Sequence, residues 1–387
     1  MTRITQLQQA MGDVDAVVLR LAENILLATG YWLQIGGLGM VVVPREGSPT
    51  LVIPDYEQQD ASTHWGGAIE TFPIIRFDAG PAGAAIERIL RGVASDLGVQ
   101  GGRRIGFEGS FETIGLPTFT GEANAVAAPT QALIRATFET ETLVDVTGML
   151  ETVRLVKTDE EIARIRLTNE IAGLGLEAFK EHAVAGRTEA EVAAAVDAAI
   201  VSGGHGHKGA RVVRSYATVW SGPETESAWQ YFRHRARRIE PDDVVMVELG
   251  TVVDGFWADH TRTVVAGRAT ERQREALAAV TAGIDAAFAA CRGGAVARDV
   301  DAASRAACQE LGFTQFPHHT GHGLGFRYHE ARPQLVPGSD HELLDGMIVA
   351  VEPGIYDAEV GGIRWEDDAV VTPTGAVRLV ESGYALD

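Results

Sequence analysis

The chain has 387 residues, which is long enough for two domains with complete hydrophobic cores. Hydrophobic residues make up 45% of it, which excludes a disordered chain, and the formal charge of −20 argues against nucleic acid as a partner, because phosphate backbones require a basic surface. No apolar run approaches the length of a membrane span, and the N-terminus lacks the apolar core of a signal peptide, so we expect no membrane partner. We expect Cys291 and Cys308, which lie in Ala-rich helical sequence, to be buried thiols of a cytoplasmic protein.

Residues 1–154 predict an N-terminal α/β domain. Apolar stretches at 14–19, 51–54 and 104–108 predict strands, and residues 82–97 have the apolar spacing of a helix. The glycine pair between this helix and the last strand is ordinary loop sequence rather than a phosphate-binding motif. This half of the chain therefore offers no convincing chemistry.

The second predicted domain, residues 155–387, repeats its order of elements. Capping boxes, in which a threonine is followed three residues later by Glu or Gln, predict helix starts at 158–161, 188–191 and 270–273. Each half of the domain then runs as helix, helix and strands, and the strands are expected at 211–220, 244–265, 347–351 and 363–372. This order predicts two related halves that share one curved sheet, although the repeat is weak as sequence.

The most informative stretch is a hairpin with the sequence VVMVELGTVVDGFWADHTRTVV. Asp254 and Gly255 supply a tight turn, which places Gly250 opposite Asp259 on the neighbouring strand. Glu248 then lies diagonal to Asp259 on the same face, and the missing side chain of Gly250 leaves an open spot between them. Buried carboxylates that converge need a cation or a proton, whereas the alternative is a solvated sheet face that carries two acids.

Further candidate residues lie in the second half of this domain. The segment HHTGHGLGFRYHE contains four histidines, which are His318, His319, His322 and His329. A polar loop with capping histidines would explain any one of them, but it explains four together poorly. Glu352 follows the apolar strand 347–351, and Glu366 lies within GGIRWED, so two more predicted strands each bring an acid.

Four carboxylates and one imidazole form an oxygen-rich set of candidate metal ligands. The set consists of Glu248, Asp259, His322, Glu352 and Glu366. Such ligands suit divalent manganese, cobalt or zinc better than a thiolate site would. Because four carboxylates carry more charge than one divalent ion neutralises, two ions with bridging carboxylates are the better electrostatic match.

Four motifs in order and spacing resemble the pita-bread metallopeptidases, a family that includes prolidases, Xaa-Pro aminopeptidases, methionine aminopeptidases and the metal-free creatinases. The motifs are GFWADHTRT, TGHGLGFRYHE, VEPGIY and GGIRWED. In the first domain, NILLATGY and LVIP resemble the N-terminal domain of the prolidase and creatinase branch. The resemblance implies an α+β fold, with a creatinase-like α/β domain followed by a pseudo-symmetric pita-bread domain that has a curved, mostly antiparallel sheet and outer helices.

The resemblance also implies roles for individual residues. One ion would be held by Glu248, Asp259 and Glu366, and the other by Asp259, His322, Glu352 and Glu366. A metal-bridged hydroxide would attack the scissile carbonyl, while Glu352 relays its proton and His329 steadies the oxyanion. His318 matches a further histidine that lines the pocket.

Two positions depart from the family pattern. The first ligand is normally Asp, but this chain has Glu248, whose extra methylene moves the carboxylate. A histidine expected in the loop SGPETESAWQYFRHRARRIEPDD falls on Tyr231, and His234 is a possible substitute for it. We assign Tyr231, Arg327 and Arg364 to substrate binding. Both departures add weight to the alternative that this protein is a family member that hydrolyses an amide bond other than one to proline.

The leading functional prediction is a metal-dependent exopeptidase that cleaves an N-terminal residue from a following proline. One alternative is a creatinase-like hydrolase of a small amide or guanidino compound, and another is a catalytically silent binding protein with the same fold. We also expect a homodimer, because of the prolidase resemblance and the aromatic pair Tyr31 and Trp32. The alternative for that pair is the core of the N-terminal domain itself.

Overall fold

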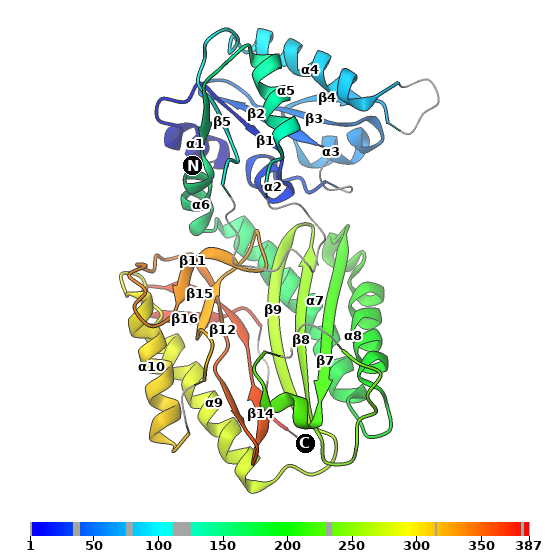
Figure 1. Ribbon diagram of the computed structural model, residues 1–387, viewed down its shortest axis with the longest axis vertical. Helices are drawn as coiled ribbons and strands as arrows, with labels where there is room; N and C mark the ends of the chain where they lie inside the picture. The colour runs from blue at the N-terminus through cyan, green and yellow to red at the C-terminus, as the bar shows by residue number, and fades with distance from the viewer. Residues whose placement is uncertain are drawn as a thin grey trace. The chain divides into compact units, whose positions relative to one another are not determined.

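The computed structural model describes residues 2–33, 39–74, 80–110, 125–229, 234–313, 316–380 and 383–386. The chain divides into two compact units, Met1–Arg154 and Leu155–Asp387, which run from blue to teal and from green to red in Figure 1. Within the described ranges, no helix is both long enough and apolar enough to cross a membrane.

The first unit is built on a six-stranded mixed sheet with the strand order β4-β3-β2-β1-β5-β6. Its strands are β1 (Ala16–Leu19), β2 (Met40–Pro44), β3 (Thr50–Pro54), β4 (Ala68–Phe72), β5 (Ile105–Phe107) and β6 (Leu143–Asp145). Its helices are α1 (Arg3–Ala10), α2 (Ala22–Thr29), the 3₁₀ turn η1 (Asp55–Glu57), α3 (Gln58–His64), α4 (Ala82–Asp96), α5 (Ala128–Phe138) and α6 (Thr147–Leu155). The three strands and the helix expected from the sequence are confirmed.

The core of the first unit explains the aromatic pair near its start. Helix α4 packs Ile86 and Leu90 against Val18 and Val42 of the sheet, and these side chains are buried together. Tyr31 and Trp32 are buried as well, and the Tyr31 hydroxyl donates a 3.0 Å hydrogen bond to Glu57 of the same unit. Tyr31 is therefore tied to its own unit, and the pair offers little exposed surface to a second copy of the chain.

The second unit contains the repeated order of helices and strands. Its helices are α7 (Asp159–His182), α8 (Glu189–Gly204), η3 (His207–Gly209), η4 (Gly222–Glu226), α9 (Glu271–Ala290) and α10 (Ala297–Glu310). Its strands are β7 (Val213–Ser221), β8 (Val244–Val253), β9 (Phe256–Val265), β10 (Gly321–Gly323), β11 (Glu330–Leu335), β12 (Ile348–Val351), β13 (Gly354–Asp357), β14 (Gly361–Arg364), β15 (Asp367–Thr372) and β16 (Gly375–Arg378). The three predicted capping boxes are confirmed at Thr158, Thr188 and Thr270.

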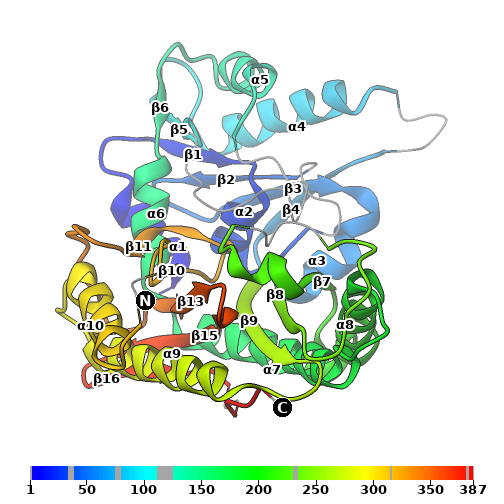
Figure 2. The same ribbon diagram turned by 60° about the horizontal axis from the view of Figure 1, so that its bottom comes forward.

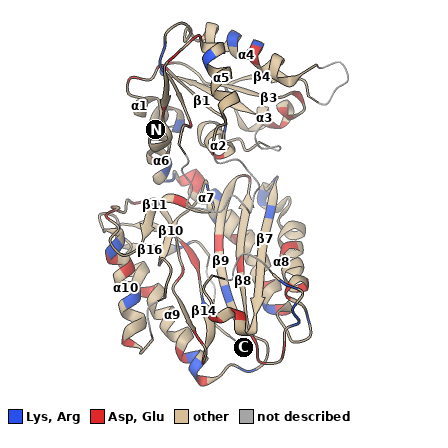
Figure 3. Ribbon diagram, in the orientation of Figure 1, with Lys and Arg blue, Asp and Glu red and all other residues tan. Residues whose placement is uncertain are grey.

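Each pair of helices covers one group of strands. Helices α7 and α8 pack on β7, β8 and β9, where Phe179 and Val196 are buried with Val247. Helices α9 and α10 pack on the group that contains β12 and β15, where Ile284 is buried with Val349 (Figure 2). Charged residues occur on the outer helices and also on β8 and β9, as the ribbon colours in Figure 3 show. Cys291 and Cys308 are free and fully buried, as expected.

The strands of this unit form three antiparallel hydrogen-bonded groups rather than one continuous ladder. Their orders are β7-β8-β9, β13-β14 and β11-β10-β12-β15-β16. The single strand expected over 363–372 is wrong, because the chain leaves the β14 ladder after Arg364 and enters β15 at Asp367. Between them, the Glu366 N–H donates a 3.1 Å hydrogen bond to the Thr261 carbonyl of β9, which joins the two halves at one point.

Candidate active site

The hairpin of β8 and β9 positions the first two acids as predicted. Asp254 and Gly255 both have positive φ angles, 49° and 89°, as a tight hairpin turn requires. The ladder pairs Gly250 with Asp259 and Glu248 with Thr261, so Glu248 and Asp259 are diagonal neighbours on one face. Because both side chains are buried, this face is not the solvated alternative.

The spot above Gly250 is not open, which corrects the expectation from the sequence. A Cβ atom at Gly250 would lie 3.0 Å from Cε2 of Tyr328, so the tyrosine ring fills this space. The Tyr328 hydroxyl lies 2.8 Å from Oε1 of Glu248 and 2.7 Å from Oδ1 of Asp259. Tyr328 is therefore a site residue that the sequence interpretation missed, because nothing in its local pattern showed that the turn before β11 would fold back onto β8.

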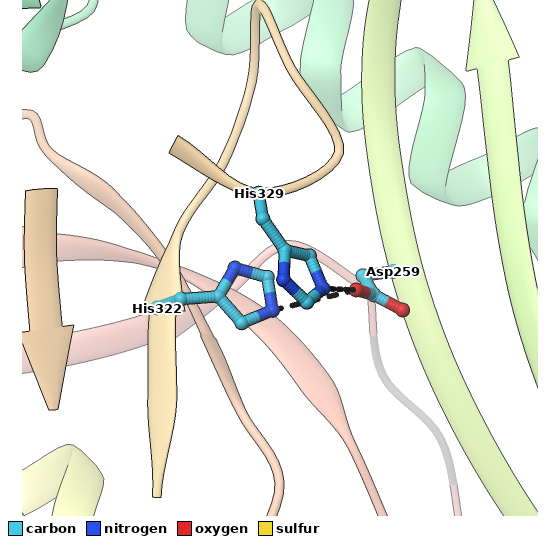
Figure 4. A group of neighbouring side chains, drawn as sticks. All are labelled: Asp259, His322 and His329. Carbon is cyan, nitrogen blue, oxygen red and sulfur yellow. Dashed lines mark ion pairs between the residues drawn. The ribbon is translucent and has the colours of Figure 1, made fainter. Parts of the chain in front are cut away.

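The second half of the unit brings three further ligand candidates to the same point. Nε2 of His322, on β10, lies 3.4 Å from Oδ2 of Asp259, 3.7 Å from Oε1 of Glu352 and 3.9 Å from Oε1 of Glu366. Nε2 of His329 lies 3.5 Å from the same Asp259 oxygen, and Figure 4 shows the two imidazoles approaching this carboxylate together. All five predicted ligand residues thus meet in one cluster.

The ring of His322 presents a lone pair to this cluster. Its Nδ1 lies 3.0 Å from the Gly323 carbonyl, which can only accept, so Nδ1 carries the proton and Nε2 does not. Burial, reinforced by the His319 charge, lowers the pKa of His322 to about 4, which keeps the ring neutral. A neutral imidazole with a free Nε2 lone pair is the form that binds a metal.

The acids of the cluster repel one another. Burial, followed by the nearby charges of Glu366 and Glu248, raises the pKa of Asp259 well above its usual range, and burial beside Glu352 does the same for Glu366. Within the described part of the chain, Asp259 Oδ2, His322 Nε2 and Glu366 Oε1 are buried and have no hydrogen-bond partner. Such atoms cost free energy unless a cation satisfies them, so these residues fit a divalent ion.

Glu352 is held by a histidine that the sequence interpretation did not single out. Its Oε1 lies 2.7 Å from Nε2 of His319, and Glu352 follows β12 directly. Burial raises the pKa of Glu352, but the His319 charge outweighs burial and lowers this pKa overall. Burial likewise lowers the pKa of His319, but Glu352 outweighs it and raises this pKa overall. Glu352 therefore stays ionised beside the cluster.

The remaining predicted residues are placed differently. His318 donates from Nδ1 to the His319 carbonyl at 2.7 Å and contacts the Tyr356 hydroxyl with Nε2 at 2.9 Å, so both ring nitrogens have protein partners. Arg364 is buried and forms an ion pair with Glu248, which engages its guanidinium inside the cluster. Arg327 is half-buried in the turn before β11, and Tyr231 lies outside the described residues. His234, the possible substitute, is exposed.

Comparison with known proteins identifies the family. The model of metallopeptidase family M24 matches residues 163–373, and that of the creatinase/prolidase N-terminal domain matches residues 3–156. The chain belongs to metallopeptidase family M24. This result confirms the predicted resemblance and the α+β, creatinase-plus-pita-bread fold class.

Characterised relatives in the M24 family include archaeal Xaa-Pro dipeptidases. The Pyrococcus furiosus enzyme is 33% identical over 239 residues, which cover 62% of this chain and 66% of that protein, so the match spans slightly less than two thirds of its length. The Xaa-Pro dipeptidase of Pyrococcus horikoshii is 27% identical over 97% of this chain and 95% of its own. The crystal structure of the Pyrococcus horikoshii prolidase superposes with a TM-score of 0.79 at 25% identity, covering 100% of this chain and 99% of that chain.

A buried ion pair fixes the turn that carries Tyr328 and His329 in this M24 chain. Lys157 Nζ lies 2.6 Å from Oε2 of Glu330, and both side chains are almost inaccessible to solvent. The other Glu330 oxygen accepts a 3.0 Å hydrogen bond from the Phe326 N–H, at the opposite end of the turn. Both ends of the turn are thus held by one carboxylate, and Lys157 is paired with it.

We expect Lys157→Met to destabilise the protein by about 3–5 kcal/mol, because it leaves the Glu330 carboxylate buried without a cation. Denaturant unfolding monitored by circular dichroism measures the change. The control is Lys180→Met on the exposed face of α7, for which we expect a change within about 0.5 kcal/mol. Equal stability of the two variants would show that the Lys157–Glu330 pair does not stabilise the turn.

Proposed function

We propose that this chain is a metal-dependent exopeptidase that removes an N-terminal residue from a following proline. The observation that carries the proposal is the convergence of three buried, unpartnered atoms, on Asp259, His322 and Glu366, on one point beside Glu352. The names of the relatives supply the substrate class, Xaa-Pro dipeptides. The oxygen-rich ligands favour manganese, cobalt or zinc.

In this proposal each residue has a defined task. Asp259, His322, Glu352 and Glu366 hold a divalent ion, which supplies Lewis acidity and lowers the pKa of a water molecule. The ionised Glu352, paired with His319 at 2.7 Å, accepts a proton and passes it towards the leaving amine. His329, which reaches the cluster from the turn before β11, donates a hydrogen bond to the developing oxyanion.

The remaining site residues keep the roles expected from the sequence. His318, fixed by His319 and Tyr356, lines the site, while Arg327 and Tyr231 stay proposed contacts for the substrate. For Arg364, the ion pair with Glu248 supports a role inside the cluster more directly than a substrate contact. A second ion bound by Glu248, Asp259 and Glu366 is the further prediction from the sequence, and these three acids lie close enough to share one.

Metal analysis combined with dipeptide hydrolysis tests the function. We expect purified protein to contain a divalent metal and to cleave Gly-Pro and Ala-Pro, and we expect a chelator to abolish cleavage until manganese, cobalt or zinc is returned. Hydrolysis that resists the chelator would favour the creatinase-like alternative. A metal-bound protein that cleaves neither dipeptide would favour a silent binding protein.

A cytoplasmic homodimer belongs to the same proposal. The two buried free thiols, Cys291 and Cys308, are the observation that supports a reducing compartment. Because the side chains of Tyr31 and Trp32 are buried, the dimer now rests on the prolidase resemblance alone. Light scattering at micromolar concentration that shows only monomer would end this part of the proposal.

A further inference from the structure

Two ion positions are predicted from the sequence. The first is formed by Asp259, His322, Glu352 and Glu366, and the second by Glu248, Asp259 and Glu366. They differ in whether their ligand atoms already have hydrogen-bond partners in the protein. At the first position, Asp259 Oδ2, His322 Nε2 and Glu366 Oε1 are buried and have no hydrogen-bond partner. At the second position, the Tyr328 hydroxyl contacts Asp259 Oδ1 at 2.7 Å, and the Thr261 hydroxyl donates to Glu366 Oε2 at 2.8 Å. The same two acids thus turn an oxygen without a hydrogen-bond partner towards the first position and an oxygen in contact with a hydroxyl towards the second.

Glu248, which belongs only to the second position, has both carboxylate oxygens engaged. Its Oε1 accepts from the Tyr328 hydroxyl at 2.8 Å, and its Oε2 lies 2.8 Å from the Thr261 hydroxyl and bonds the Arg364 guanidinium. Arg364 is in turn oriented by a 3.0 Å hydrogen bond from its Nε to Thr261. A carboxylate with one oxygen bonded to a guanidinium and the other to a phenol has little left to offer a metal.

The charge balance changes when Arg364 is included. A guanidinium is a permanent cation, and this one is buried against Glu248. It neutralises one of the four carboxylates, and the charged His319 pairs with another, so a single divalent ion at His322 leaves the cluster close to neutral. A second divalent ion at Glu248 would make the cluster positive and would lie beside the guanidinium, where the two cations repel each other.

The space at the second position is also filled. The ring of Tyr328 occupies the gap above Gly250, where a Cβ atom would already lie 3.0 Å from it, and packs edge-on against Trp257 with ring centroids 5.5 Å apart. The turn that carries Tyr328 is anchored by the Lys157–Glu330 pair. An ion bound by Glu248 and Asp259 would therefore have to displace a packed and anchored phenol.

We propose that the chain binds one divalent ion, through Asp259, His322, Glu352 and Glu366, and that Arg364 and Tyr328 replace a second ion at Glu248. This proposal rests on the metallopeptidase function, and it replaces the two-ion arrangement expected from the sequence. In it, Arg364 and Tyr328 are positioning residues, which hold Glu248 and Asp259 and leave the Asp259 Oδ2 atom for the ion.

Metal stoichiometry of the full chain tests the proposal without reference to activity. After removal of metal with a chelator, Mn²⁺ is titrated by calorimetry, and bound metal is counted by elemental analysis. We expect one ion per chain in the unaltered protein, one in Glu248→Gln and none in His322→Ala. Two ions in the unaltered protein, or loss of an ion in Glu248→Gln, would overturn the proposal whether or not any variant is active.

A phenol-deletion pair tests the role of Tyr328. Tyr328→Phe removes the hydroxyl between Glu248 and Asp259, so we expect a second, weaker Mn²⁺ to bind. Tyr356→Phe is the matched control, because its hydroxyl contacts His318 and Arg364 but not the two acids, and we expect it to bind one ion. A single ion in Tyr328→Phe, or a tyrosinate absorption band when metal is added to the unaltered protein, would refute this role.

The same titrations separate this proposal from the function on which it rests. If the unaltered protein binds no Mn²⁺, Co²⁺ or Zn²⁺ and is identical to His322→Ala, the metallopeptidase function fails and the one-ion proposal fails with it. If it binds two ions and cleaves Xaa-Pro dipeptides, the function stands and only the one-ion proposal fails.

Discussion

Asp259→Asn is expected to abolish dipeptide hydrolysis and to remove the bound metal. Asp259 is fully buried, and its Oδ2 lies 3.4 Å from Nε2 of His322, so the variant loses a proposed ligand charge at the centre of the cluster. We expect metal affinity to fall by more than the factor of about 10–100 that is typical for residues behind the ligands. Elemental analysis and a Gly-Pro assay measure the two effects.

The stability of the metal-free variant distinguishes a ligand from a structural residue. Burial and the neighbouring acids raise the pKa of Asp259, so its charge costs folding free energy above its ordinary pKa, and Asn removes that cost. We expect the metal-free variant to melt no lower than the metal-free parent at neutral pH, and we expect added metal to stabilise only the parent. The control is Asp285→Asn on the exposed face of α9, and full activity in Asp259→Asn would refute the site.

His329→Ala is expected to slow hydrolysis by about 10²–10³-fold while the metal content stays unchanged, on the scale of losing one oxyanion donor. His329 keeps 13% of its side chain exposed and reaches the cluster from a turn, whereas His322 is fully buried on β10. Its ring stacks on that of Tyr328 with a centroid separation of 4.8 Å, which orients it without a metal. Single-turnover kinetics and elemental analysis check the two parts of this prediction.

The control for this variant is His205→Ala at the exposed end of α8, for which we expect ordinary turnover. If His329→Ala loses its metal as well as its turnover, then His329 is a ligand and its assignment to the oxyanion is wrong. Ligation by His329 is a real alternative, because the candidate ligand atoms of Asp259, His322 and His329 lie within 4.8 Å of one another.

Local sequence patterns predicted most of the helices and strands of the second unit, Leu155–Asp387. The turn residues Asp254 and Gly255 fixed the register of β8 and β9, because a two-residue turn leaves only one pairing. Capping boxes located three helices for a similarly local reason, since the Thr and the Glu or Gln satisfy the same helix end. The strand break at Trp365 was not predictable in this way, because a long-range bond from Glu366 to Thr261 causes it.

Within the site, side-chain types could be predicted, but their partners could not. Carboxylates and imidazoles were found because their chemistry is visible in the sequence. The packing of Tyr328 over Gly250 and the pairing of Arg364 with Glu248 join residues that are about 80 or more positions apart in the chain. The charge count from the sequence, in which four carboxylates favoured two ions, did not include the Arg364 cation. Only the folded structure shows these contacts.

The Lys157–Glu330 pair bears on how the chain can be divided. Lys157 falls between the two family matches, which end at residue 156 and begin at residue 163, although its amine is joined to the turn of His329. A truncated protein that starts at residue 163, where the peptidase match begins, would retain every proposed metal ligand and yet leave the buried Glu330 carboxylate without its Lys157 partner. A fragment cut to contain the second unit should therefore include Lys157, which lies outside both family matches but within that unit.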